Sequence, residues 1–289
     1  MDVAPVRSFT RIVAHRIGAL QDEYLSLGRS LGASRLLWEI GTAGADVRSL
    51  RARLDLDSGY LSRLLRSLEQ EGLVVVEPDP RDRRVRTARL TPAGLEALRE
   101  VDHAGDQAAR SLLASLNDAQ RRTLVEAMGT VERLLTAGLV RVAIEDPRSP
   151  AAQHCLQAYY DELATRFEAG FDPGHTRPAT AAELTEPAGL FLVARLTEDP
   201  IGCGALKLDG DTAEIKRMWV APAARGLGVG RRLLHELEQH ARDRGVTRLR
   251  LETNRALREA INLYRSAGFT EVPAFNAEPY AHHWFEKRL

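Results

Sequence analysis

Apolar residues in the first half of the chain recur at helical spacing. The clearest set stands at positions i, i+3, i+4 and i+7 and consists of Leu61, Leu64, Leu65 and Leu68. Side chains at this spacing lie on one face of an α-helix, so they predict a buried leucine stripe. Asp57 precedes the stripe and is a residue type that accepts hydrogen bonds from free N–H groups at a helix start. The pattern predicts a helix that begins after Asp57 and ends at Gly72.

Further helices are predicted around this one. A long first helix is marked by Phe9, Ile12, Val13, Ile17, Leu20 and Leu31. Ser34 is the expected N-cap of a second helix, which turns Leu36, Leu37 and Ile40 inward, and Asp46 is the expected N-cap of a third over residues 47–54. Thr91 followed by Pro92 predicts another helix start. A last helix is predicted from Asn117 to about Gly138.

Two short strands interrupt this helical half. They are predicted at residues 73–77 and 85–90, and the charged residues between them form a turn. After about residue 139 the pattern changes to the period of two that is typical of strands. Strands are expected at 139–144, 190–196, 201–208, 212–220 and 248–254, and helices at 151–167, from 231 onward and at 259–268. We therefore predict two domains, a mostly α domain over residues 1–139 and an α/β domain over residues 140–289.

Composition adds few restrictions. Hydrophobic residues make up 44% and charged residues 28% of the chain, as in globular proteins, and 40 basic residues balance 40 acidic ones. The net charge therefore does not indicate a nucleic-acid partner. The positive charge is nearly all arginine, which suits phosphate and guanine contacts but also follows from a GC-rich genome. Two cysteines and the lack of a long apolar stretch predict a cytoplasmic protein without a membrane span.

The most informative motif is a glycine-rich run between a predicted strand and a predicted helix. It reads Arg225-Gly226-Leu227-Gly228-Val229-Gly230. The glycines leave room for a ligand near the backbone, and the helix start supplies unpaired N–H groups, so the run is suited to a pyrophosphate. No Gly-Lys-Ser/Thr follows, which excludes a P-loop, and Leu233 stands where a dinucleotide fingerprint needs its third glycine. The alternative is an ordinary strand-to-helix turn.

A second motif follows about thirty residues later, Ala260-Ile261-Asn262-Leu263-Tyr264 leading to Gly268-Phe269. Together the two motifs resemble the signatures of the GNAT acetyltransferases, over residues 140–289. The resemblance implies an α/β fold with a mixed sheet, acetyl-CoA as cofactor and acetyl transfer to a primary amine of a small molecule or a protein lysine. The implied cofactor-binding residues are Met218, Trp219, Val220, Arg225, Gly226, Leu227, Gly228, Val229, Gly230, Arg231, Asn254, Asn262 and Arg265.

The resemblance also implies roles in catalysis. Backbone N–H groups of Met218 and Val220 are expected to polarise the thioester, and Tyr264 is the expected general acid for the departing sulfur. Glu214 is the preferred general base and Glu252 the second candidate. The alternatives are a packed Tyr264, a surface Asn262 and a Glu214 that is paired with Lys216 or an arginine.

The helix after Asp57 carries polar and cationic residues opposite its leucine stripe. These are Ser58, Tyr60, Ser62, Arg63 and Arg66, and the following hairpin tip carries Arg81, Arg83 and Arg84. Such side chains suit a major groove and a minor groove or phosphate, respectively, whereas the alternative is a solvated surface. With the spacing Asp79-x-Arg81-Asp82-x-Arg84, residues 7–140 resemble the winged helix-turn-helix of MarR regulators. That resemblance implies binding to an operator in double-stranded DNA and a homodimer formed by the flanking helices.

The sequence thus predicts a transcriptional regulator fused to an N-acetyltransferase. The alternative is a transcription factor whose second domain only senses acetyl-CoA or a metabolite. A metal site is not expected, because the adjacent His282 and His283 would point to opposite faces of a strand.

Overall fold

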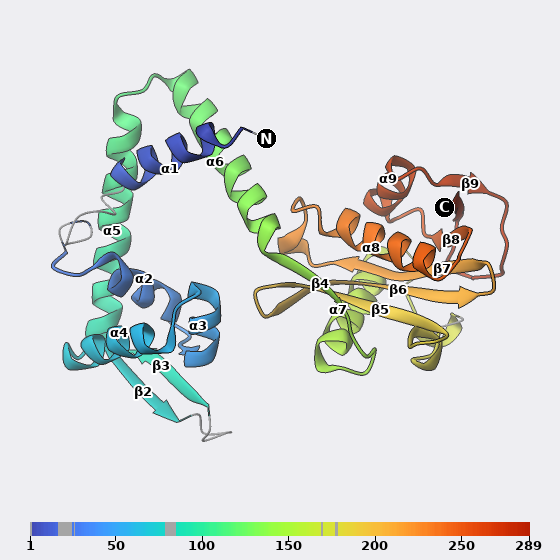
Figure 1. Ribbon diagram of the computed structural model, residues 1–289, viewed down its shortest axis with the longest axis horizontal. Helices are drawn as coiled ribbons and strands as arrows, with labels where there is room; N and C mark the ends of the chain where they lie inside the picture. The colour runs from blue at the N-terminus through green and yellow to red at the C-terminus, as the bar shows by residue number, and fades with distance from the viewer. Residues whose placement is uncertain (1, 17–24, 26, 79–84, 169, 177–178) are drawn as a thin grey trace. The chain divides into compact units, whose positions relative to one another are not determined.

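The computed structural model describes residues 2–16, 25, 27–78, 85–168, 170–176 and 179–289. The chain forms two compact units, Met1–Ala127 and Met128–Leu289 (Figure 1). The division falls within α6 (Asp118–Leu139), and β4 (Val140–Ile144) begins at the next residue. The domain boundary at residue 139 stays a prediction. Within the described ranges, no helix is long and apolar enough to cross a membrane.

The first unit is mostly helical with a small sheet. Its elements are α1 (Ala4–Arg16), α2 (Leu31–Ile40), β1 (Ala45–Asp46), α3 (Val47–Leu54), α4 (Ser58–Gln70), β2 (Val74–Pro78), β3 (Arg86–Leu90) and α5 (Pro92–Ala114). The strands form an antiparallel sheet in the order β1-β3-β2. The predicted leucine stripe of α4 is buried against α2, α3 and the sheet, so the helix-turn-helix and the hairpin share one core.

Most of the predicted helix starts in this unit are confirmed. The carboxylate of Asp46 accepts hydrogen bonds from Arg48 N and Ser49 N, that of Asp57 accepts one from Tyr60 N, and the Thr91 hydroxyl accepts one from Gly94 N. Each cap satisfies N–H groups that have no partner within the helix.

The predicted start of the second helix was wrong. Ser30, not Ser34, is the N-cap of α2, and it accepts a hydrogen bond from Ala33 N at 3.3 Å. Leu31 is consequently the first residue of α2 rather than part of the first helix. Ser34 lies one turn inside α2, where its side chain is buried. Of the residues expected in the first helix, Ile17 and Leu20 fall outside the described residues.

The second unit is a mixed sheet with helices on both faces. Among the residues that the structure describes, its seven strands run in the order β4-β5-β6-β7-β8-β10-β9, and only the β7–β8 pair is parallel. The strands after β4 are β5 (Gly189–Leu196), β6 (Asp199–Asp209), β7 (Thr212–Val220), β8 (Arg248–Thr253), β9 (Thr270–Val272) and β10 (His283–Arg288). The predicted mixed α/β fold is therefore confirmed.

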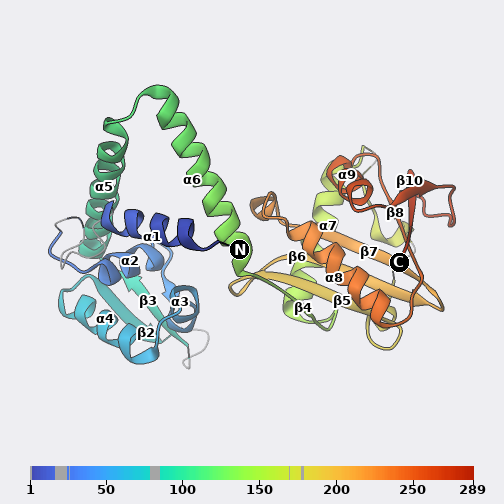
Figure 2. The ribbon, with the colours of Figure 1, turned by 45° about the horizontal axis from the view of Figure 1, so that its top comes forward.

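Three helices cover this sheet. They are α7 (Pro150–Arg166) on one face, and α8 (Val229–Asp243) and α9 (Arg258–Ser266) on the other (Figure 2). Leucines of α8 and the inward residues of β6 to β8 make one core, whereas α7 packs with Phe191, Cys203 and Trp219 in a second core. Short 3-10 turns occur at Pro173–His175, Ala182–Leu184 and Pro222–Ala224. The sheet is thus held between two apolar layers, and the site described next lies where its central pair of strands separates.

Candidate active site and DNA-binding surface

The sheet opens between β7 and β8. These parallel strands are in register only from Thr212 to Glu214 on β7 and from Arg248 to Arg250 on β8. Beyond that point β7 carries an irregularity in its pairing with β6, and Arg217 has a φ of 57°, a left-handed conformation that is rare for residues other than glycine. Two cavities occupy the opening, and Met218, Tyr159 and Tyr264 line both.

The backbone of β7 points donors into this opening. The N–H of Ala221 donates to Ile201 O on β6 at 2.9 Å. Neighbouring N–H groups of an extended strand point to opposite edges, so the N–H of Val220 and, two residues earlier, that of Met218 point away from β6. Both groups are thus turned toward the edge where β8 has separated.

The glycine-rich loop forms one wall of one of these two cavities. Gly226 and Gly228 have φ values of 87° and 76°, and a Cβ atom at either position would meet nothing within 4 Å. Gly228 is the N-cap of α8 and has no side chain to cap it, so the first N–H groups of α8 stay available to a ligand. Of the predicted cofactor residues, the cavity is lined by Met218, Trp219, Val220, Arg225, Gly226, Gly228, Val229, Gly230 and Arg231. We call it the loop cavity.

Glu162 on α7 ties the loop to the opposite face of the sheet. Its carboxylate accepts hydrogen bonds from Arg225 at 2.6 and 2.7 Å and from Trp219 Nε1 at 2.9 Å. Burial disfavours the ionised carboxylate, but Arg225 and Arg166 outweigh it and hold the pKa of Glu162 below its usual value. Arg225 is thus held in place as a cation beside the loop cavity.

Tyr264 lies where the two cavities meet. It comes from α9, is 5% exposed and packs near Phe269 and Phe285. Burial, and next the charge of Glu252, raise the pKa of its hydroxyl well above the usual tyrosine value. The hydroxyl therefore keeps its proton at neutral and moderately alkaline pH.

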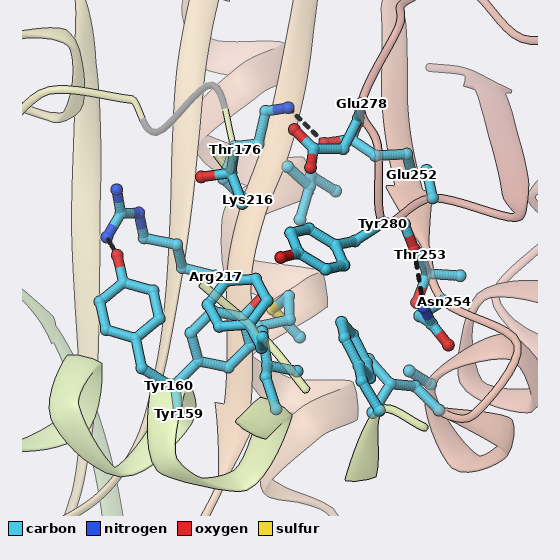
Figure 3. A pocket seen from close by; sticks show the side chains of 18 of the residues that line it. Tyr159, Tyr160, Thr176, Lys216, Arg217, Glu252, Thr253, Asn254, Glu278 and Tyr280 are labelled. Carbon is cyan, nitrogen blue, oxygen red and sulfur yellow. Dashed lines mark hydrogen bonds and ion pairs between the residues drawn. The ribbon is translucent and has the colours of Figure 1, made fainter. Parts of the chain in front are cut away.

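The second cavity has a charged end, which we call its inner end, and an aromatic part, which we call its outer part (Figure 3). At the inner end, Lys216 Nζ lies 2.6 Å from Glu252 and 2.9 Å from Glu214. Burial lowers the pKa of Lys216, but these two carboxylates outweigh it and raise the pKa overall. Glu252 lines the cavity with Lys216, and its side chain is 11% exposed. We call this second space the acceptor cavity.

Several predicted site residues lie elsewhere. Glu214 is not among the described residues that line either cavity, and its carboxylate is paired with Lys216, which is the alternative considered for it. Asn254 lines the acceptor cavity rather than the loop cavity, and its amide is engaged by the protein itself, since it donates to Tyr280 O and accepts from Ala256 N. Asn262 is exposed, and Arg265 pairs with Glu271 on the surface. Leu227 packs against the core rather than lining the loop cavity.

Residues of α7 were missed by the motif search. Tyr159, Glu162, Leu163 and Arg166 all line the loop cavity, and they stand at i, i+3, i+4 and i+7. That spacing continues the buried row of Ala152, Cys155 and Leu156 on the inward face of α7, and it was a usable signal. It did not indicate, however, which strands the helix would cover.

The predicted DNA-binding face of α4 is exposed in the structure. Ser58, Tyr60, Ser62, Arg63 and Arg66 all lie on the surface, opposite the buried leucine stripe. The guanidinium of Arg63 lies 5.7 Å from the centre of the Tyr60 ring. Among the described residues, neither Arg63 nor Arg66 has an ion-pair partner, so both can meet an anion. Arg81, Arg83 and Arg84 fall outside the described residues.

Two different protein families match the two halves of the chain. A model of the acetyltransferase (GNAT) family matches residues 156–269, and a model of the MarR family matches residues 27–85. An IAA acetyltransferase of Azospirillum brasilense is 44% identical over 99 residues, which are 34% of this chain and 63% of that protein. The N-alpha-acetyltransferase RimI of Mycobacterium tuberculosis is 34% identical over 142 residues, which are 48% of this chain and 84% of that protein.

The similarity covers the relatives to different extents. The chain spans between 53% and 63% of the length of the first three curated relatives that it matches. A solved GNAT-family acetyltransferase from Staphylococcus aureus is similar over 52% of this chain and 98% of its own, with 17% identity and a TM-score of 0.44. The chain belongs to the GNAT acetyltransferase family through its second half, and residues 27–85 of its first half match the MarR-family model.

Proposed function

We propose that the protein is a DNA-binding regulator that also transfers the acetyl group of acetyl-CoA to a primary amine. The observation that carries the enzymatic half is the meeting of the loop cavity and the acceptor cavity at Tyr264 in the opening of the sheet. A donor held by the glycine loop and an amine held on the other side would reach the same point. Proximity of this kind supplies a large part of the rate enhancement in acyl transfer.

The donor would lie along the loop cavity. The N–H groups at the start of α8 and the guanidiniums of Arg225 and Arg231 suit its pyrophosphate. The apolar residues Val220, Leu257 and Leu263 suit its uncharged arm. The thioester oxygen would then accept hydrogen bonds from the β7 N–H groups that point into the opening.

Each proton and each bond in the proposed acetyl transfer can be assigned to the substrates or to a residue of the site. The amine nitrogen attacks the thioester carbon, the negative charge that develops on oxygen is met by the N–H groups of Met218 and Val220, and the C–S bond breaks. The departing thiolate takes a proton from Tyr264. The amine proton passes to a carboxylate, and we assign that role to Glu252 rather than Glu214, because Glu252 lines the acceptor cavity.

The regulatory half of the proposal rests on α4 and on its two arginines, Arg63 and Arg66, which have no ion-pair partner among the described residues. A helix capped by Asp57, anchored by four leucines and exposing serine, tyrosine and arginine is suited to a major groove. Apolar residues of α1 and α6 are exposed, for example Phe9 at 46% and Leu134 at 69%. Their exposure supports a homodimer, which would present two α4 helices to an operator with two half-sites.

The experiment for the enzymatic half uses a charge placed in the loop. Gly228→Glu puts a carboxylate where the pyrophosphate would lie, and acetyl-CoA should then no longer raise the melting temperature as it does for the wild type. Gly210→Glu is the matched control, because Gly210 also has a positive φ of 62° with open space around it but lies in the turn between β6 and β7. A wild-type protein that acetylates no amine, whether or not acetyl-CoA stabilises it, would contradict the enzymatic half of the proposal.

A further inference from the structure

The outer part of the acceptor cavity is built from aromatic side chains. We call Tyr159, Tyr160, Phe167, Phe171 and Tyr280 the aromatic cluster, and all of them line the cavity. They come from α7, from the segment that follows it and from the loop before β10. Successive ring centres are 5.0 Å apart for Phe171 and Tyr280, 5.8 Å for Tyr160 and Phe171, and 5.7 Å for Phe167 and Phe171. The rings therefore form one continuous surface.

Tyr280 also joins two sides of the cavity. Its hydroxyl accepts a hydrogen bond from Asp172 N at 3.0 Å, and its carbonyl accepts one from the Asn254 side chain at 2.7 Å. Figure 3 shows its ring lying between the Lys216–Glu252 pair and the α7 tyrosines. A link across the cavity leaves little space for an extended peptide, so it favours a small acceptor over a lysine on a protein.

The charges separate the two ends of the cavity. At the inner end, two carboxylates face one lysine, which leaves a net negative charge that suits an ammonium group. At the outer end, Arg217 donates to the Tyr160 hydroxyl and to Ala179 O, and its guanidinium lies 5.6 Å from the centre of the Tyr160 ring. Because the Arg217 guanidinium is already in contact with Tyr160, binding of a second cation there, such as the far end of a polyamine, is disfavoured.

We propose that the acceptor is an arylalkylamine, a primary amine joined by a short chain to an aromatic ring. The ring lies within the aromatic cluster, and the amine points toward Glu252 and Tyr264. Aromatic pairs prefer tilted or offset contacts with centres about 4.5–7 Å apart, the range in which the rings of the cluster already lie. This inference rests on the proposed acetyltransferase activity and names the acceptor of the same site.

The test compares an aromatic amine with its saturated counterpart and with two primary amines of other classes. Initial rates with acetyl-CoA give kcat/KM for 2-phenylethylamine, 2-cyclohexylethylamine, putrescine and a lysine peptide. We expect 2-phenylethylamine to exceed 2-cyclohexylethylamine by about 3- to 10-fold, the size of a specific aromatic contact, and to exceed the other two by more. Equal or higher values for the cyclohexyl compound, putrescine or the peptide overturn the inference.

A pair of variants locates the effect. Phe171→Leu keeps an apolar side chain but removes a ring from the cluster, and it should raise KM for 2-phenylethylamine about 3- to 10-fold while KM for acetyl-CoA stays the same. Phe275→Leu is the control, because Phe275 packs under Arg250 and is not among the described residues that line the acceptor cavity. An equal change in both variants, or an equal change for aromatic and aliphatic amines, overturns the inference.

Failure of the proposed acetyltransferase activity would give a different result from failure of the arylalkylamine inference. Acetyl-CoA would then bind, as judged by thermal stabilisation, yet no amine in the panel would be acetylated. Transfer to aliphatic amines without preference for aromatic ones would instead keep the enzyme and exclude this acceptor class.

Discussion

At the scale of single residues, Tyr264 is one of the side chains that line both cavities. Its hydroxyl is buried and protonated, as a general acid for a departing thiolate must be. Tyr264→Phe should lower kcat by roughly 10²- to 10⁴-fold, because general acid catalysis contributes about that much, while the dissociation constant of acetyl-CoA holds. Steady-state kinetics and a binding titration measure the two quantities. An unchanged kcat would assign Tyr264 to packing alone.

The same tyrosine gives a prediction for pH. Burial disfavours the charged phenolate, so the pKa of Tyr264 lies above the usual tyrosine value of about 10. The hydroxyl therefore stays protonated even when the pH reaches that usual value. The amine acceptor becomes more reactive over the same range because it loses its proton. The kcat should therefore rise or stay level between about pH 8 and pH 10. A fall in kcat over this range, in a protein that stays folded by circular dichroism, would contradict the assignment.

The residues that sequence reasoning placed well are those whose role is local. Gly226 and Gly228 had to lie in the loop cavity, because a loop between a strand and a helix start brings its own backbone to the ligand. The choice between Glu214 and Glu252 depended instead on where β7 and β8 separate, which is a contact between segments far apart in the chain. The hydrogen bond from Asn254 to Tyr280 could not be predicted for the same reason, since Tyr280 lies on a distant loop.

At the scale of elements, α4 is a helix with one buried and one open face. The double variant Arg63→Ala/Arg66→Ala should weaken binding to DNA from the protein's own promoter region. A base-reading arginine is worth about 1–3 kcal/mol, and a phosphate contact would lower the salt slope by about 1. Fluorescence anisotropy at several salt concentrations separates the two effects.

The control for this variant removes the same charge from the other unit. Arg141→Ala/Arg148→Ala changes two exposed arginines of β4 and the turn that follows it. Equal DNA affinity of the wild type and the α4 variant would remove α4 as the reading helix. A loss of affinity in the control as large as that in the α4 variant would mean that overall charge, not position, determines binding.

Element types could be predicted because periodicity and caps are properties of short segments. The helices after Asp46, Asp57 and Thr91 begin where their side chains can accept N–H bonds. The start of α2 was misplaced, since Ser30 and Ser34 are both capping residues and only the packing of Leu36, Leu37 and Ile40 decides between them. The order of the strands could not be predicted from the sequence, because the parallel β7–β8 pair joins segments that α8 separates along the chain.

At the scale of the whole molecule, α6 ends at Leu139 and β4 begins at Val140, so no linker residue separates the helix of one half from the sheet of the other. We expect ligand binding and DNA binding to be coupled, because a direct connection limits independent motion. If acetyl-CoA or acceptor weakens operator affinity by some factor, the operator must weaken ligand affinity by the same factor. Titrating each ligand at fixed salt in the presence and absence of the other measures both. Affinities that do not change in either direction would mean two independent activities.

The separation of β7 from β8 leaves two strand edges facing each other inside the second unit, from Glu214 and Arg250 onward. Free strand edges are a hazard in most proteins, because another chain can pair with them and begin aggregation. Here the exposed groups lie within a cleft that α7 and α9 flank, so a small molecule can enter where a foreign strand cannot. The arm of acetyl-CoA carries amide groups of its own. A cofactor that pairs with these edges would complete the sheet, so that a small molecule, rather than another chain, satisfies the open strand edges.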